Sequence, residues 1–114
     1  MNNLTVIPAA PANNYLHPDD LYLFKDIKQK RFIAPPWKGL VIGVATNNYP
    51  LETKSSTLTI SILKFSEFFS ADCKNKTKLA DKYKISYVYS GKFDCPDFKL
   101  IGNSREGLYL YRYK

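Results

Sequence analysis

The sequence predicts a small α+β domain, with an antiparallel sheet of about five strands and one or two helices on one face of that sheet. The chain has 114 residues, the size of one ordinary domain. Hydrophobic residues make up 45% of it and aromatic residues 15%, which is enough for one compact core. The predicted strands follow one another with few helical segments among them, which is typical of this class. A partly open β-barrel is the alternative, because strands with hairpin connections could also close.

Residues 1–16 are expected to form an N-terminal arm, and residues 17–114 the single domain. The first helix should begin at Pro18, because a proline at the first helical position has no N–H group to leave unpaired. Two aspartates follow it, and the helix dipole favours negative charge in the first turn. An apolar stripe with helical spacing continues from there, so this helix is expected to end near Lys30.

Two strands are predicted in the middle of the chain. Residues 39–46 are almost continuously apolar, which is typical of a central strand buried on both faces. In residues 56–65, polar residues separate Leu58, Ile60 and Ile62, so these three side chains are expected to face the core. The loop between the two strands is expected to pair them antiparallel.

The second half of the chain predicts a helical segment followed by strands. Apolar residues fall on one side of a helix over residues 65–83, but the polar stretch 74–78 interrupts them. This segment is therefore either one helix with a basic outer turn or two short helices separated by a loop. A strand is expected over 85–90, and residues 98–101 and 108–113 should form a hairpin around a glycine-containing turn.

No segment typical of secretion or membrane insertion is visible. The first residues lack the basic and apolar regions of a signal peptide, and the longest apolar run, residues 40–45, is too short to cross a bilayer. The protein is therefore expected in the cytoplasm, without a membrane span. Cys73 and Cys95 should then be free thiols, because a disulfide needs an oxidising compartment. Neither cysteine has a Cys or His at metal-ligand spacing.

The sequence offers little for catalysis. His17 is the single histidine, so a histidine-based metal cluster cannot form. Nucleophile-elbow, Walker and dinucleotide-binding glycine motifs are all missing from the sequence. The chain is therefore expected not to be an enzyme and to use no cofactor or metal, unless the fold brings carboxylates together.

The formal charge of +7 is concentrated in two stretches. Residues 25–38 and residues 74–92 each hold several lysines or arginines against a single aspartate. A clustered positive field attracts nucleic acid, acidic proteins or anionic surfaces. The alternative is that these faces only keep the protein soluble.

Aromatic residues accompany these basic stretches. Trp37 follows two prolines and could stack on a base while Lys30, Arg31 and Lys38 contact phosphates; alternatively, Trp37 anchors the core. On the last strand, tyrosines alternate with leucines. If the leucines are core, the tyrosines are exposed and form a platform for binding; alternatively, they stabilise the sheet as cross-strand pairs.

We therefore predict a non-enzymatic nucleic-acid-binding protein that prefers single strands. The alternative is a small protein-binding module, such as an inhibitor, immunity or accessory factor, that docks on an acidic partner protein. Its candidate binding residues are basic or aromatic: Lys28, Lys30, Arg31, Trp37, Lys38, Lys74, Lys76, Lys78, Tyr109, Tyr111 and Tyr113.

Overall fold

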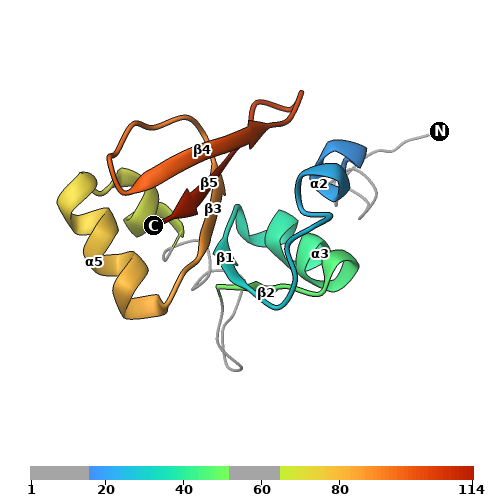
Figure 1. The fold of residues 1–114 in the computed structure, drawn as a ribbon, viewed down its shortest axis with the longest axis horizontal. Coiled ribbons are helices and arrows are strands. Elements are labelled where there is room, and N and C mark those ends of the chain that lie inside the picture. The colour runs from blue at the N-terminus through green and yellow to red at the C-terminus, as the bar shows by residue number, and fades with distance from the viewer. Residues whose placement is uncertain (1–15, 52–64) are drawn as a thin grey trace.

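The computed structural model describes residues 16–51 and 65–114 and contains a five-stranded sheet with helices on either side (Figure 1). The predicted small α+β domain is confirmed. The sheet has two open edges, β2 and β4, so the barrel alternative is wrong. The elements in chain order are α2 (Pro18–Leu23), β1 (Arg31–Ile33), α3 (Pro36–Thr46), β2 (Tyr49–Pro50), α5 (Cys73–Tyr83), β3 (Tyr87–Ser90), β4 (Phe98–Asn103) and β5 (Tyr109–Tyr113).

The sheet is mixed, with strand order β2-β1-β3-β5-β4. β1 is parallel to both β2 and β3, whereas β5 is antiparallel to β3 and to β4. The predicted strand over 85–90 and the predicted hairpin are therefore present as β3, β4 and β5. The parallel pairs differ from the wholly antiparallel sheet that we expected. They follow from helical crossovers, because parallel neighbours cannot be joined by a tight turn.

The strand predicted over residues 39–46 is wrong, because these residues belong to helix α3. A short apolar run does not distinguish a buried strand from a buried helix. Ile42 is fully buried, and Gly43 lies against β2 so closely that a Cβ atom there would come within 2.7 Å of Pro50 Cδ. The helix is thus the crossover that connects the parallel strands β1 and β2.

Helix α2 begins where the sequence predicts but ends at Leu23, well before Lys30. The buried Asn48 side chain holds the segment that follows. Its Nδ2 donates to the Ile27 carbonyl at 2.7 Å, and its Oδ1 accepts from the Lys30 N–H at 3.0 Å. These tertiary hydrogen bonds take the place of helical ones in the segment before β1, where Gln29 has a φ of 56°.

The region 65–83 forms two short helices, one over residues 65–70 and the other α5. The break lies at Ala71 and Asp72, and the lysine-rich stretch 74–78 is helical. Asp72 caps α5 by accepting from the Asn75 N–H at 2.9 Å.

The strand expected over 56–65 lies outside the described residues, apart from Phe65, which is helical. The prediction that Leu58, Ile60 and Ile62 face the core therefore stays untested.

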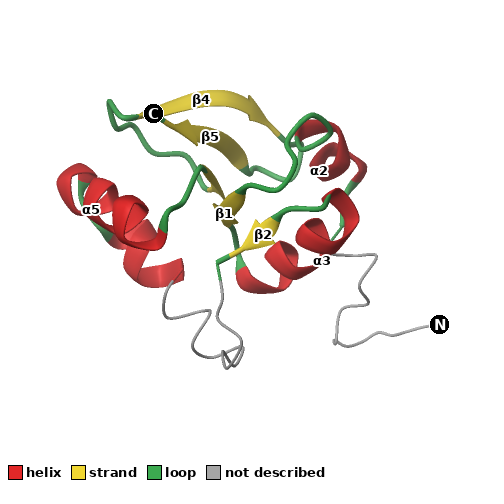
Figure 2. Cartoon of the chain, turned by 60° about the horizontal axis from the view of Figure 1, so that its bottom comes forward, coloured by secondary structure: helices red, strands yellow, loops and turns green. Residues whose placement is uncertain are grey.

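Helices cover both faces of the sheet, and Figure 2 shows α5 on one side with α2 and α3 on the other. Successive strand residues alternate between two cores. One core includes Ile33, Val88 and Tyr111 together with Phe68 and Ala80. The second core includes Phe32, Tyr89, Leu110, Phe24 and Ile42. The helices thus occupy two layers rather than the one layer that we expected.

Candidate functional site

Basic side chains from several segments gather at one end of the sheet. The register aligns Arg112 of β5 with Tyr87 of β3 and with Lys99 of β4, so these side chains form one row across adjacent strands. Arg31 of β1 lies beside Ser86, whose N–H donates to the Arg31 carbonyl at 2.8 Å. We call this end of the sheet the basic edge. Its basic residues are Lys28, Lys30, Arg31, Lys84, Lys99 and Arg112.

The basic residues of the basic edge are all exposed. Within the described ranges 16–51 and 65–114, ion pairs involve only His17, Lys38 and Arg105 as the cationic partners. The basic edge is therefore not neutralised by carboxylates of this part of the chain. Lys28 Nζ donates to the Thr46 carbonyl at 3.3 Å, at the C-terminal end of α3, where the helix dipole favours a cation. Such a concentration of charge attracts polyanions.

Two tyrosines lie among these cations. Tyr87 is half-buried in the row with Arg112 and Lys99. Tyr49 is the register partner of Arg31 and is 51% exposed. A tyrosine ring with one open face can stack on a nucleobase. The basic edge thus combines charge for phosphates with rings for bases.

Sequence reasoning found half of the basic edge. It named Lys28, Lys30 and Arg31, which are consecutive or nearly so. It left out Lys84, Lys99 and Arg112, and only strand pairing brings the last two to this end. The alternation along β5 was a usable signal, since it places Arg112 on the same face as Leu110.

Lys38 does not belong to this surface, although we expected it to contact phosphates. Its side chain is buried, and its Nζ lies 2.7 Å from Asp20 Oδ2 and 2.8 Å from Glu106 Oε1. Asp20 is fully buried and also accepts from the His17 N–H at 2.8 Å and from the Tyr89 hydroxyl at 2.5 Å. These contacts join α2, α3, β3 and the β4–β5 turn.

The hydroxyl of Tyr89 stays protonated in this cluster. Burial raises the pKa of Tyr89 far above its usual value, and the hydrogen bond to Asp20 raises it further. Its proton is therefore held between the phenol oxygen and the carboxylate. The arrangement suits a structural clamp, in which each buried charge has a partner.

Asp19 points away from Asp20 and binds the β4–β5 turn from outside. Arg105 donates to it from Nε at 3.0 Å and from Nη2 at 2.9 Å, and the Arg105 N–H adds a bond of 2.9 Å. These hydrogen bonds lower the pKa of Asp19 to about 2. Sequence reasoning missed this pair and the Asp20 cluster, because their partners are far away in the chain.

The expected exposed tyrosine ladder is wrong for Tyr111, which is buried in the core beneath α5. Its ring stacks on Phe93 at 4.1 Å between centroids, and its hydroxyl donates to the Phe93 carbonyl at 2.9 Å. Tyr109 and Tyr113 are half-buried against the same core. Both faces of β5 are covered by helices, so the tyrosines and Leu110 are buried on opposite sides.

The three lysines predicted on α5 divide into two kinds. Lys74 and Lys78 are exposed, whereas Lys76 is buried. Lys76 Nζ donates to the carbonyls of Phe69 at 2.9 Å and Ala71 at 2.5 Å, at the end of the helical segment 65–70. Burial lowers the pKa of Lys76. Lys76 therefore caps a helix and is not open to a phosphate.

Trp37 lies in the first turn of α3, and its side chain is outside the described residues. Its predicted stacking role stays a prediction.

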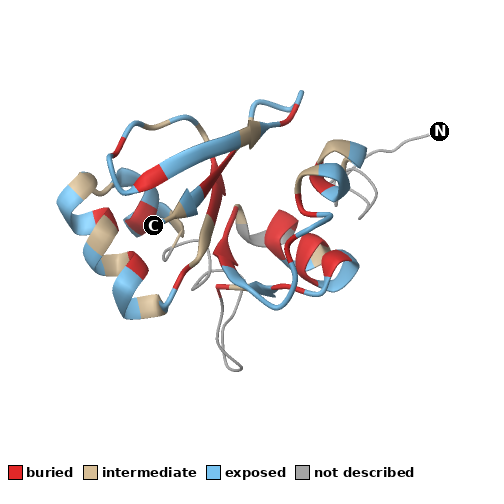
Figure 3. Ribbon diagram, in the orientation of Figure 1, coloured by how far each residue is buried: buried red, intermediate tan, exposed pale blue. Residues whose placement is uncertain are grey.

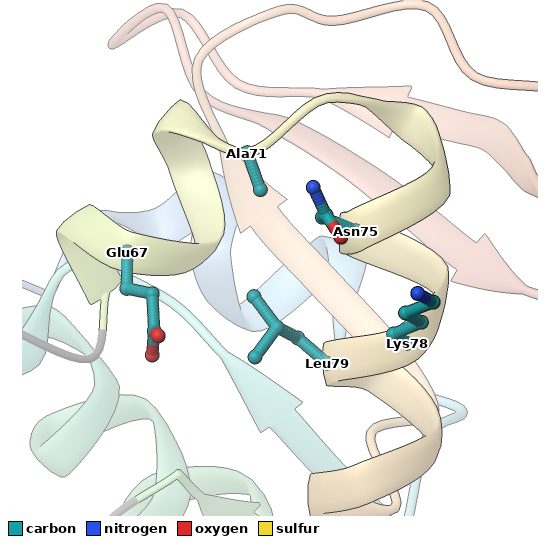
Figure 4. Close-up of a pocket in the computed structure, with 5 residues that line it drawn as sticks. All are labelled: Glu67, Ala71, Asn75, Lys78 and Leu79. Atoms are coloured by element: carbon teal, nitrogen blue, oxygen red, sulfur yellow. The ribbon is translucent and has the colours of Figure 1, made fainter.

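A shallow pocket of about 350 Å³ lies between the helical segment 65–70 and α5 (Figure 4). Leu79 forms its apolar wall, and Glu67 and Lys78 stand on opposite sides of it. Ala71 and Asn75 complete the lining. The opposite charges of Glu67 and Lys78 make this pocket a poor site for a polyanion.

The prediction of free thiols is wrong, because Cys73 and Cys95 form a disulfide with their Cα atoms 5.4 Å apart. The two residues are 22 positions apart in sequence, and sequence spacing does not show which loops meet. The bond attaches the first residue of α5 to the loop between β3 and β4.

In the described residues, neither a cluster of three or more His, Cys, Asp or Glu side chains suited to a metal nor a helix long and apolar enough to cross a membrane is present. Comparison with protein-family models, with curated proteins and with solved structures found no match to the chain.

Proposed function

We propose that this protein binds nucleic acid, preferably single-stranded, through the basic edge, and that it does so without catalysis or a cofactor. The observation that carries the proposal is the strand register that unites Tyr87, Arg112 and Lys99 in one row, with Phe32 as the β1 neighbour of Tyr87 and Arg31 one residue before it at the same end of the sheet. Lysine and arginine would bind phosphates, and the tyrosine rings would stack on unpaired bases. Such contacts position a nucleic-acid strand without reading its base sequence. The cytoplasm stays the expected compartment, and there the Cys73–Cys95 disulfide would have to be transient.

The proposal is tested by titrating a fluorescent single-stranded oligonucleotide and the matching duplex at several salt concentrations. Each neutralised phosphate of a single strand contributes about 0.7 to the slope of log affinity against log salt. Replacing Lys30, Arg31 and Arg112 with glutamine should therefore flatten that slope by about 2.

Lys74→Gln/Lys78→Gln is the control variant, because these lysines are equally exposed but lie on α5. It should keep the wild-type slope. An unchanged slope in the Lys30, Arg31 and Arg112 variant would place the contact elsewhere and overturn the proposed surface. Thermal unfolding should be nearly the same for both variants, since the changed residues are exposed.

A second candidate function, docking on an acidic partner protein, is favoured by strand β4. This strand is a sheet edge and is largely exposed along its length (Figure 3). Leu100 and Ile101 are 47% and 42% exposed and follow Lys99 directly. An edge strand with apolar and basic side chains can pair with an extended acidic segment. Absence of oligonucleotide binding even at low salt would favour this candidate.

A further inference from the structure

The disulfide between Cys73 and Cys95 joins a half-buried residue to a buried one of the same core. Cys73 is the first residue of α5 and is half-buried. Cys95 is 6% exposed and belongs to the core that contains Val88 and Phe98. Cys73 is therefore the more accessible of the two residues to a thiol or disulfide that arrives from solvent.

Cys73 also lies at the start of a helix. The N-terminal turn of an 11-residue helix presents free N–H groups and the positive end of the helix dipole. Lys74 follows on the same turn. Two groups act in the opposite direction. The Asp72 carboxylate lies beside Cys73, although it is engaged by the Asn75 N–H, and the Asp94 carbonyl oxygen lies 3.3 Å from Cys73 Sγ. A thiolate at a helix start beside a covered second thiol is the arrangement that exchange chemistry uses.

We propose that Cys73 and Cys95 form a thiol–disulfide exchange site, in which Cys73 reacts with the partner molecule and Cys95 resolves the intermediate. Its substrates are thiol–disulfide couples, either small molecules or proteins with an accessible disulfide. The proposal is independent of nucleic-acid binding, because neither cysteine is among the residues of the basic edge, although the Cys95 carbonyl accepts from the Phe98 N–H at the start of β4. In a cytoplasmic protein, a disulfide is usually transient and serves catalysis or redox sensing.

In the reduced protein, the Cys73 thiolate attacks one sulfur of the substrate disulfide and forms a mixed disulfide. The other substrate sulfur leaves as a thiolate and takes a proton from solvent. Cys95 then loses its proton and attacks Cys73 Sγ, which closes the intramolecular disulfide and releases the second substrate thiol. Two electrons pass from the protein to the substrate. A dithiol drives the same steps in reverse.

The test compares Cys95→Ser with Cys73→Ser, each incubated folded with oxidised glutathione and followed by intact-protein mass spectrometry. Each variant keeps one thiol and is the matched control for the other. Cys95→Ser should gain one glutathione more than about tenfold faster than Cys73→Ser, because only its thiol is accessible and activated. Equal rates, or faster reaction of Cys73→Ser, would overturn the proposal.

A measurement on the unmodified chain covers the case in which a variant does not fold. The wild-type protein is reduced step by step with dithiothreitol, and its near-UV circular dichroism is recorded. The reduced protein should keep its folded spectrum and should return to the disulfide form with oxidised glutathione, through a species glutathionylated at Cys73. Loss of the folded spectrum on reduction would show a purely structural bond and would refute an exchange site.

Discussion

At the scale of single residues, the start of α2 shows how neighbouring side chains of one type acquire different roles. Asp19 and Asp20 lie next to each other on one helical turn, so their side chains diverge by about 100°. Asp20 enters the protein and binds Lys38 and Tyr89, whereas Asp19 stays at the surface and binds Arg105. The ion pair between Asp19 and Arg105 makes a contribution to the free energy of unfolding that depends on pH.

The pKa of Asp19 is about 2 in the folded chain, against an ordinary value of 3.8. A lowered carboxyl pKa stabilises the fold above the ordinary value, and this stabilisation is lost as the pH falls through the folded value. The difference in urea midpoint between wild type and Asp19→Asn should thus be constant above about pH 5 and shrink between about pH 4 and pH 2. A difference that stays constant down to pH 2 would contradict the prediction.

At the scale of elements, α3 depends on two glycines on the face that packs against β2. A Cβ at Gly43 would meet Pro50 Cδ at 2.7 Å and the Asn48 carbonyl oxygen at 3.0 Å. A Cβ at Gly39 would meet Pro50 Cβ at 3.4 Å, which is an ordinary contact. The helix can therefore accept a methyl group at one end and not at the other.

Gly43→Ala should destabilise the protein by about 1–3 kcal/mol, because a proline ring and a backbone oxygen cannot move aside easily. Gly39→Ala is the matched control. It should be neutral or stabilising by up to about 1 kcal/mol, because alanine has the higher helix propensity. Urea unfolding of both variants measures these differences. Equal destabilisation by the two substitutions would contradict the close packing of α3 on β2.

At the scale of the whole molecule, the buried cluster of Lys38, Asp20, Glu106 and Tyr89 connects elements that the sheet alone does not hold together. It reaches from α2 and α3 to the turn after β4, where Glu106 supplies the second carboxylate. Removing one partner of a buried ion pair leaves an uncompensated charge, which costs more than the pair itself contributes.

Lys38→Met should therefore destabilise the fold by about 3–5 kcal/mol. Lys30→Met, at an exposed lysine, should change stability by less than about 0.5 kcal/mol. Asp20→Asn combined with Lys38→Met should cost less than the sum of the two single changes, because the residues share one interaction. Additive effects in urea unfolding would show that the two charges are not coupled.

The sequence predicted the start of α2 and the second half of the fold, but not β1, α3 or β2. The start of α2, the strand β3 and the hairpin of β4 and β5 follow from capping chemistry, strand alternation and turn residues, all of which act over a few positions. The same local patterns identified the cluster of Lys28, Lys30 and Arg31. They could not identify α3, because a short apolar run fits a buried helix and a buried strand equally well.

The tertiary structure alone decided which of the predicted binding residues are exposed to a ligand. Lys38 and Lys76 look like surface lysines in the sequence but are buried, because carboxylates in one case and helix-terminal carbonyls in the other satisfy their charge. Tyr111 is buried because helices cover both faces of the sheet, and strand pairing carries Arg112 to the basic edge. Burial and pairing depend on contacts between residues far apart in the chain, and local periodicity carries no record of those contacts.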